Sequence, residues 1–116
     1  MKRPGQTVLF RFPHTDLSAG KLRPALLLRQ VPGHHGDWLI CMVSSQLRHL
    51  APNFDELIGE DDSDFRKSGL KVTSVIRIGR LAVVEEDMLL GRLGEIGPER
   101  LSRLTNRLAS WLIGDR

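Results

Sequence analysis

Residues 23–45 read RPALLLRQVPGHHGDWLICMVSS and contain two continuously apolar runs separated by a turn sequence. Apolar runs of this length are typical of strands that are covered on both faces. The intervening PGHHG, residues 32–36, favours a tight reversal of the chain. We therefore predict two antiparallel strands over 23–31 and 38–44, and this hairpin decides the fold class.

The centre of the hairpin indicates which residues lie opposite each other. If the strands pair about a turn centred near His34, the numbers of opposite residues sum to about 68. Arg23 then lies opposite Ser45, with Ser44 inside a one-residue register error. A guanidinium forks onto phosphate oxygens, and serine hydroxyls also donate to them. An ordinary surface arginine at a strand end explains the same pairing. The pairing therefore fits both a phosphate-binding site and a surface without a specific function.

Further strands are expected on both sides of the hairpin. Alternating apolar residues predict strands over 7–12 and 72–78, with 81–84 extending or following the second. A short strand is expected over 54–58, whereas residues 88–93 fit a strand or a helix. The prediction is a mainly β fold: an antiparallel sheet curled into a small barrel, in a single domain spanning residues 1–116.

A helix is predicted at the C-terminal end of the sequence. Gly97-Pro98-Glu99 places proline and an acid in a first helical turn, and Gly114 ends the helix. One face of it carries Leu101, Leu104, Leu108, Trp111 and Leu112. This register predicts that the helix packs on the sheet and that Trp111 belongs to the core.

Composition limits the class of protein. Hydrophobic residues make up 41% and charged residues 27%, an ordinary globular balance. No apolar run is long enough to span a membrane, and no signal peptide is indicated. The single cysteine, Cys41, suits a reducing cytoplasm and is expected to be a small buried hydrophobe.

Charge is distributed unevenly along the chain. Residues 1–50 carry seven Lys or Arg against two Asp, whereas residues 51–70 carry six acids against two bases. The basic half permits a nucleic-acid partner without establishing one. The acidic run over residues 60–64 is expected to keep a loop solvated.

The histidines give weak signals on their own. His34 and His35 are expected at a hairpin tip, since no other ligand type stands at metal-binding spacing. His49 follows the third strand without a visible partner. His14, in the loop that leads to Arg23, is either a solvated side chain or a group that assists proton transfer. The sequence therefore suggests no metal and no cofactor.

Several segments, in this order and spacing, resemble MazF/PemK-type toxins over about residues 5–113. They are VLFRFP (8–13), TDLS (15–18), KLRPAL (21–26), VSSQ (43–46), SGLKVTSV (68–75) and LGRLG (90–94). The resemblance implies a small SH3-like antiparallel β-barrel with a C-terminal helix, acting as a cytoplasmic homodimer. It also implies a toxin that cuts single-stranded RNA at short sequences without a metal ion and is silenced by a cognate antitoxin.

The resemblance assigns roles to particular residues. The family's essential arginine and threonine fall on Arg23 and Ser44, the positions that the hairpin brings together. Arg23 would stabilise charge on the phosphate, because an arginine pKa above about 12 makes a poor base. Ser44 would hold a phosphate oxygen. RNA contacts are expected from Ser18, Lys21, Ser45, Gln46 and His14.

The sequence departs from the family pattern in three places. His14 stands where similar members often have Phe, and Leu17-Ser18-Ala19 replaces a Gly-Ser-Glu segment. Ser44 keeps the hydroxyl of the usual Thr but loses its methyl group. These departures concern sequence preference and catalytic rate rather than the fold.

Two other functions remain open. One is a toxin that resembles CcdB and poisons DNA gyrase through its C-terminal end, a comparison suggested by Trp111. The other is an inactive relative that serves as a nucleic-acid or protein-binding module. The Arg23-Pro24 block favours the ribonuclease.

Overall fold

The computed structural model describes residues 2–11, 22–33 and 36–114. Its strands are β1 (Gln6–Arg11), β2 (Leu22–Gln30), β3 (Trp38–Ser44), β4 (Glu56–Ile58), β5 (Ser74–Val84) and β6 (Leu89–Glu95). Its helices are α1 (Phe65–Ser68) and α2 (Pro98–Leu112), with 3-10 turns η1 (Leu47–His49) and η2 (Glu86–Met88). None of these helices is long and apolar enough to cross a membrane.

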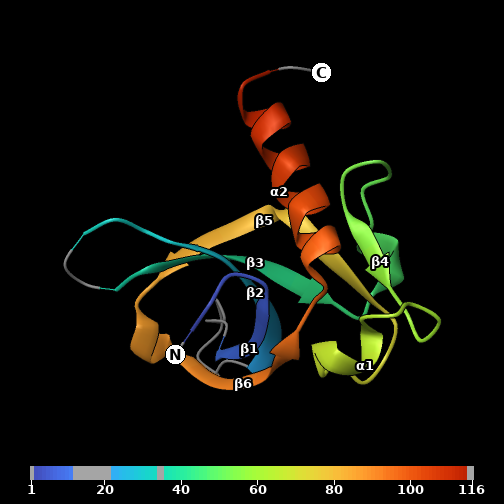
Figure 1. Cartoon of the computed structure of the whole chain (residues 1–116), viewed down its shortest axis with the longest axis horizontal. Helices are drawn as coiled ribbons and strands as arrows, with labels where there is room; N and C mark the ends of the chain where they lie inside the picture. The colour runs from blue at the N-terminus through green and yellow to red at the C-terminus, as the bar shows by residue number, and fades with distance from the viewer. Residues whose placement is uncertain (1, 12–21, 34–35, 115–116) are drawn as a thin grey trace.

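The strands form one sheet in the order β4-β5-β3-β2-β1-β6. Every neighbouring pair is antiparallel. The sheet is strongly curled, so that β6 passes beneath β3 and β5 in the view of Figure 1, and it stays open between β4 and β6. This confirms the predicted mainly β fold with a C-terminal helix.

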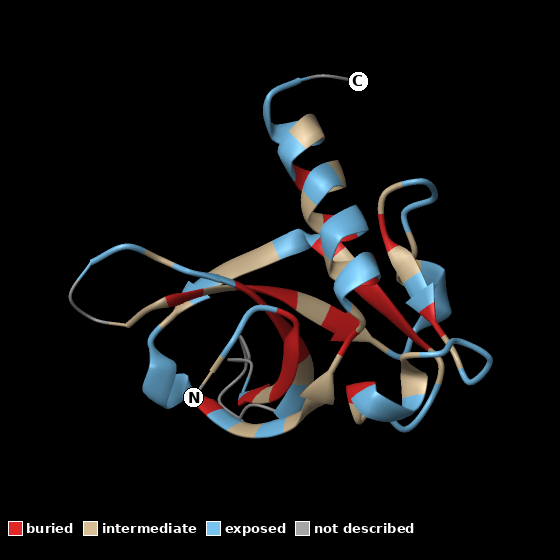
Figure 2. Cartoon of the chain, viewed as in Figure 1, coloured by how far each residue is buried: buried red, intermediate tan, exposed pale blue. Residues whose placement is uncertain are grey.

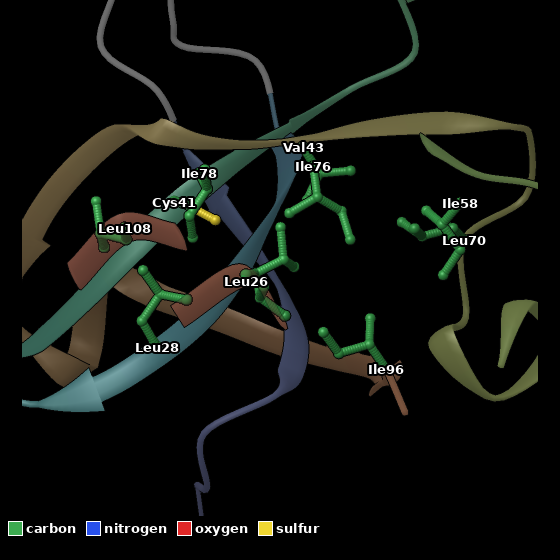
Figure 3. Close-up of a cluster of buried hydrophobic side chains, with 11 residues drawn as sticks. Leu26, Leu28, Cys41, Val43, Ile58, Leu70, Ile76, Ile78, Ile96 and Leu108 are labelled. Atoms are coloured by element: carbon green, nitrogen blue, oxygen red, sulfur yellow. The ribbon is translucent and has the colours of Figure 1, made fainter. Parts of the chain in front are cut away.

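The apolar runs of β2 and β3 are buried because both faces of the sheet are covered (Figure 2). On one face, Leu26, Cys41 and Ile76 pack with Leu104 and Leu108 of α2. Figure 3 shows side chains of this cluster converging from the strands and the helix. The opposite face holds a second cluster: Val8, Phe10, Ala25, Leu27, Trp38, Ile40 and Leu89. The central hairpin thus belongs to two cores at once.

The structure changes the bounds or the type of three predicted elements. The predicted strand over 54–58 is shorter, because Asp55 accepts the backbone N–H groups of Ala51 and Ile78 and ends the preceding turn. The strands predicted over 72–78 and 81–84 are one strand, β5, which begins at Ser74 rather than at residue 72 and whose pairing with β3 shifts between Cys41 and Met42. Residues 89–95 are a strand.

The acidic run over 60–64 is only partly the solvated loop that was expected. Residues 60–63 are exposed. Asp64, however, accepts hydrogen bonds from Arg100 Nε and from the backbone of Gly97, both at 2.8 Å. The carboxylate therefore lies at the N-terminus of α2, where the helix dipole favours negative charge.

The expectation that Trp111 belongs to the core is wrong. Its side chain is 51% exposed, although its ring contacts Phe54 at a centroid distance of 5.8 Å. Helical register with Leu104 and Leu108 fails as a guide here because the last turn of α2 projects beyond the sheet, as Figure 1 shows.

Candidate nucleic-acid interface

Arg23 and Ser44 lie at the same end of the hairpin. Ala25 pairs with Met42 across β2 and β3, and this register, continued by two residues, sets Arg23 level with Ser44. The hairpin register is therefore confirmed to within the one-residue error, in favour of Ser44 over Ser45. Arg23, Ser45 and Gln46 are exposed, and Ser44 is partly buried.

The 3-10 turn η1 brings a histidine back to the end of β3. The Ser44 hydroxyl lies 2.8 Å from Nδ1 of His49 and accepts the Gln46 backbone N–H at 3.0 Å. Turn hydrogen bonds from the His49 N–H to the Gln46 carbonyl and from the Leu50 N–H to the Leu47 carbonyl hold this arrangement. His49 had no visible partner in the sequence, and the structure provides Ser44.

Arginines from three elements surround His49. Desolvation of the ring lowers its pKa below the ordinary value, and the positive charges of Arg77, Arg48, Arg80 and Arg23 lower it further. A neutral imidazole at pH 7 follows from this surrounding charge. Arg77 is brought next to the end of β3 by its pairing with Met42 across β3 and β5.

The side chain of Gln46 is already partly committed. Its amide oxygen accepts a hydrogen bond from Arg48 at 2.7 Å. The amide N–H groups of Gln46 are the donors that remain for a base edge or a phosphate. This contact also fixes the Arg48 guanidinium beside the strand end.

A pocket of about 420 Å³ opens next to Arg23. Its walls are largely apolar and include Leu22, Pro24, Val43, Leu70 and Leu93. Arg23, Ser45 and Lys71 also line it and supply two positive charges and a hydroxyl. Such a pocket can receive a base or another flat apolar group whose attached phosphate meets the cations.

A larger depression, of about 640 Å³, is a poor candidate for the same ligand. Its lining includes Glu85, Glu86 and Asp87, with Lys2 as its cation. Like charges repel a phosphate backbone. The basic strand end is therefore the better surface for a nucleic acid.

Some predicted site residues lie outside the described part of the chain. These are His14, Ser18 and Lys21, together with the expected hairpin tip at His34 and His35. Cys41 is fully buried, and this burial raises the pKa of its thiol, as expected for a small core residue rather than a nucleophile. In the described ranges, no group of three or more His, Cys, Asp or Glu is arranged to hold a metal ion.

Sequence reasoning missed His49, Arg48, Arg77, Arg80 and Lys71. Arg77 and Arg80 reach the site only through the pairing of β5 with β3, a contact between segments more than 30 residues apart. His49 had a local signal, a Ser-Ser-Gln segment followed within three residues by a histidine, which is compatible with a tight turn.

Comparison with known proteins agrees with this architecture. An endoribonuclease from a mycobacterial species, solved in complex with its cognate antitoxin, has the same fold: the TM-score is 0.65 at 20% identity, over 97% of this chain and 95% of that one. No curated protein matches the sequence significantly. The model of the PemK-like, MazF-like toxins of type II toxin–antitoxin systems matches residues 3–112, and the chain therefore belongs to that family.

Proposed function

We propose that this chain is a sequence-specific endoribonuclease that cuts single-stranded mRNA without a metal ion. The observation that carries this proposal is the register of β2 and β3, which sets the exposed Arg23 level with Ser44. Arginines near His49 add a positive surface around this pair. Phosphate neutralisation by such arginines supplies most of the affinity for a nucleic-acid backbone.

The proposed reaction uses the RNA as its own nucleophile. The 2′-oxygen forms a bond to the neighbouring phosphorus while the bond from phosphorus to the 5′-oxygen breaks. A 2′,3′-cyclic phosphate and a 5′-hydroxyl result. Arg23 stabilises the charge that builds up on the phosphate oxygens, a task that suits the forked guanidinium.

Neighbouring residues would hold the substrate. Ser45 shares the 420 Å³ pocket with Arg23, so a base can enter between apolar walls while its phosphate contacts both. Gln46 offers amide N–H groups beside it. Hydrogen bonds to the edges of unpaired bases would give the sequence preference.

The proposal includes two protein partners. The mycobacterial endoribonuclease was solved with its cognate antitoxin, and a cognate antitoxin is proposed here as well. A homodimer is proposed as the acting form, since the open edges of β4 and β6 and the exposed end of α2 leave surface for a second copy. We propose the cytoplasm, where mRNA is present, as the place of action.

A gyrase-binding toxin is the second candidate. The exposure of Trp111 at the end of α2 favours it more than the sequence did, because a projecting indole is a common anchor at protein interfaces. The family assignment and the basic strand end favour the ribonuclease.

The decisive assay is cleavage of single-stranded RNA by the purified protein in EDTA. The wild type is expected to give discrete products, and Arg23→Ala and Ser44→Ala are expected to slow their formation at least about 100-fold. Undiminished cleavage by Arg23→Ala would overturn the mechanism. Gyrase inhibition that depends on Trp111, without any RNA cleavage, would favour the second candidate.

A further inference from the structure

The Ser44 hydroxyl has one hydrogen to donate, and its surroundings indicate where that hydrogen goes. Its oxygen already accepts the Gln46 backbone N–H at 3.0 Å. The ring nitrogen Nδ1 of His49 lies 2.8 Å away, within range for a hydrogen bond. If Nδ1 is the acceptor, the hydroxyl points its hydrogen at His49 and keeps one lone pair free for an incoming hydroxyl.

The charges that face His49 favour the neutral ring as this acceptor. Within the described residues they come from three elements: Arg23 on β2, Arg48 on η1, and Arg77 and Arg80 on β5. Together with desolvation they keep the pKa of His49 below its ordinary value, so its ring has a free lone pair at neutral pH. These four charges are cationic, unlike the carboxylate that stabilises the imidazolium in a Ser-His-Asp triad.

We propose that Ser44 and His49 form a proton relay that takes the proton from the attacking 2′-hydroxyl of RNA. This inference rests on the proposed ribonuclease function and supplies the general base that Arg23 cannot be. Ser44 Oγ accepts the 2′-hydroxyl proton and passes its own to Nδ1 of His49. The 2′-oxygen bonds to phosphorus, the bond to the 5′-oxygen breaks, and water protonates the leaving oxygen. His49 acts through Ser44 and is a positioning residue.

The same arrangement couples the base to substrate binding. A phosphodiester placed among Arg23, Arg48, Arg77 and Arg80 offsets their positive charge at His49. Its imidazole then becomes a stronger base only when RNA is present. The acid limb of kcat, which reports the enzyme–RNA complex, should therefore lie at higher pH than the acid limb of kcat/KM, which reports the free enzyme.

The test compares His49→Gln, Ser44→Ala, Ser44→Thr and the double variant His49→Gln/Ser44→Ala. Ser102→Ala, an exposed serine on α2, is the matched hydroxyl control, and circular dichroism with thermal melting checks folding. We expect His49→Gln to lower kcat at least about 100-fold, the usual contribution of a general base, with RNA affinity changed less than about threefold. Its acid limb should disappear. Ser44→Thr, which keeps the hydroxyl, should retain most activity.

The double variant distinguishes a relay from two separate contributions. Residues that act as one unit give non-additive losses, so the double variant should be no slower than the slower single variant. Added imidazole should restore part of the rate to His49→Ala, because it can enter the space left by the ring.

Two results would overturn the relay while leaving the proposed function intact. One is an unchanged kcat and acid limb in His49→Gln. The other is a loss confined to RNA binding, which would make His49 a contact residue. A wild-type protein that cuts no RNA at any pH would overturn the ribonuclease itself, and the relay with it.

Discussion

At the scale of single residues, Arg23 is the group on which the proposed chemistry depends. It is exposed at the start of β2, where it can reach a phosphate without displacing any core side chain. Its planar fork can bind two phosphate oxygens at once, whereas a lysine ammonium is a compact point charge. The charge and the shape of this side chain can be tested separately.

Arg23→Lys keeps the charge and removes the fork. We expect kcat to fall about 10- to 100-fold and RNA affinity to change little, because one donor of a stabilising group is lost in the transition state. Single-turnover cleavage rates and filter binding measure the two effects. Arg29→Lys is the matched control, because it is exposed on the same strand roughly 20 Å away at about 3.3 Å per residue. Equal rates for Arg23→Lys and wild type would mean that the fork is not used.

The sequence predicted the pairing of Arg23 with Ser44 but not the histidine and the further arginines that lie around this pair. Arg23 and Ser44 could be paired because hairpin geometry is local and its turn was clear. His49 required knowledge that residues 47–49 form a 3-10 turn that folds back on Ser44. The positions of Arg77 and Arg80 depend on the register between β3 and β5, two strands that are distant in the sequence. No local sequence pattern indicates that register.

At the scale of elements, a close approach of α1 to β6 explains two glycine-containing motifs. Gly69, which ends α1 with φ 73°, lies against the backbone of Leu93, and Gly94 of β6 lies against the backbone of residues 67–69. A Cβ at Gly94 would overlap the carbonyl oxygen of Lys67, and a Cβ at Gly69 would overlap that of Leu93. The SGLKVTSV and LGRLG segments therefore meet in space.

Gly94→Ala should destabilise the fold by about 2 kcal/mol or more, since backbone atoms must move to admit the methyl group. Gly91→Ala is the matched control on the same strand, because a Cβ there meets nothing within 4 Å. Urea denaturation measures both. A Gly94→Ala protein as stable as Gly91→Ala would contradict the close approach.

A second link joins α2 to the β4 region through buried charge. Arg100 is 7% exposed and pairs with Asp64 at 2.8 Å and Glu56 at 2.9 Å. Burial alone would raise the pKa of both carboxyls, yet both pKa values are lowered. Around Glu56 the pKa is lowered by Arg103, Arg107 and Arg100. Around Asp64 it is lowered by Arg100 and by the hydrogen bond from the Gly97 N–H. α1 and the buried Arg100 were not predicted, because a four-residue helix and a single arginine on an amphipathic helix leave no periodic signal.

This cluster predicts a dependence of stability on pH. A carboxylate whose pKa is lower in the folded chain stabilises the fold above its unfolded pKa, about 4, and this contribution disappears as pH falls through the folded pKa. The contribution of Glu56 and Asp64 to the unfolding free energy should therefore be fully present above about pH 5 and fall progressively below about pH 4. Urea titrations between pH 2 and pH 7 measure it.

Arg100→Met should lower the unfolding free energy at pH 7 by about 3 kcal/mol, because it removes the buried cation that pairs with Asp64 and one of the three arginines that pair with Glu56. It should also flatten the dependence below about pH 4. Arg66→Met, on the exposed side of α1, serves as the control. An unchanged acid slope in Arg100→Met would assign that slope to other carboxylates.

At the scale of the whole molecule, a curled sheet brings the ends of β2, β3 and β5 to one surface (Figure 1). The strands and helix were predictable because long apolar runs and a helical leucine repeat are strong periodic signals. The projection of the α2 tip was not predictable, because it depends on where the sheet ends beneath the helix. One basic surface and one exposed apolar tip are the result, and we propose that the ribonuclease site lies on the first.

The most direct test of the proposed ribonuclease reaction is cleavage of RNA that lacks one 2′-hydroxyl. Once the cut site is mapped, the same oligonucleotide is made with a single 2′-deoxynucleotide on the 5′ side of the scissile phosphate, and both are incubated with the wild-type protein in EDTA. The account predicts that the all-RNA strand gives 2′,3′-cyclic phosphate and 5′-hydroxyl ends by mass spectrometry, while the substituted strand binds but is not cut there. Cleavage of the substituted strand at that same phosphate would contradict it.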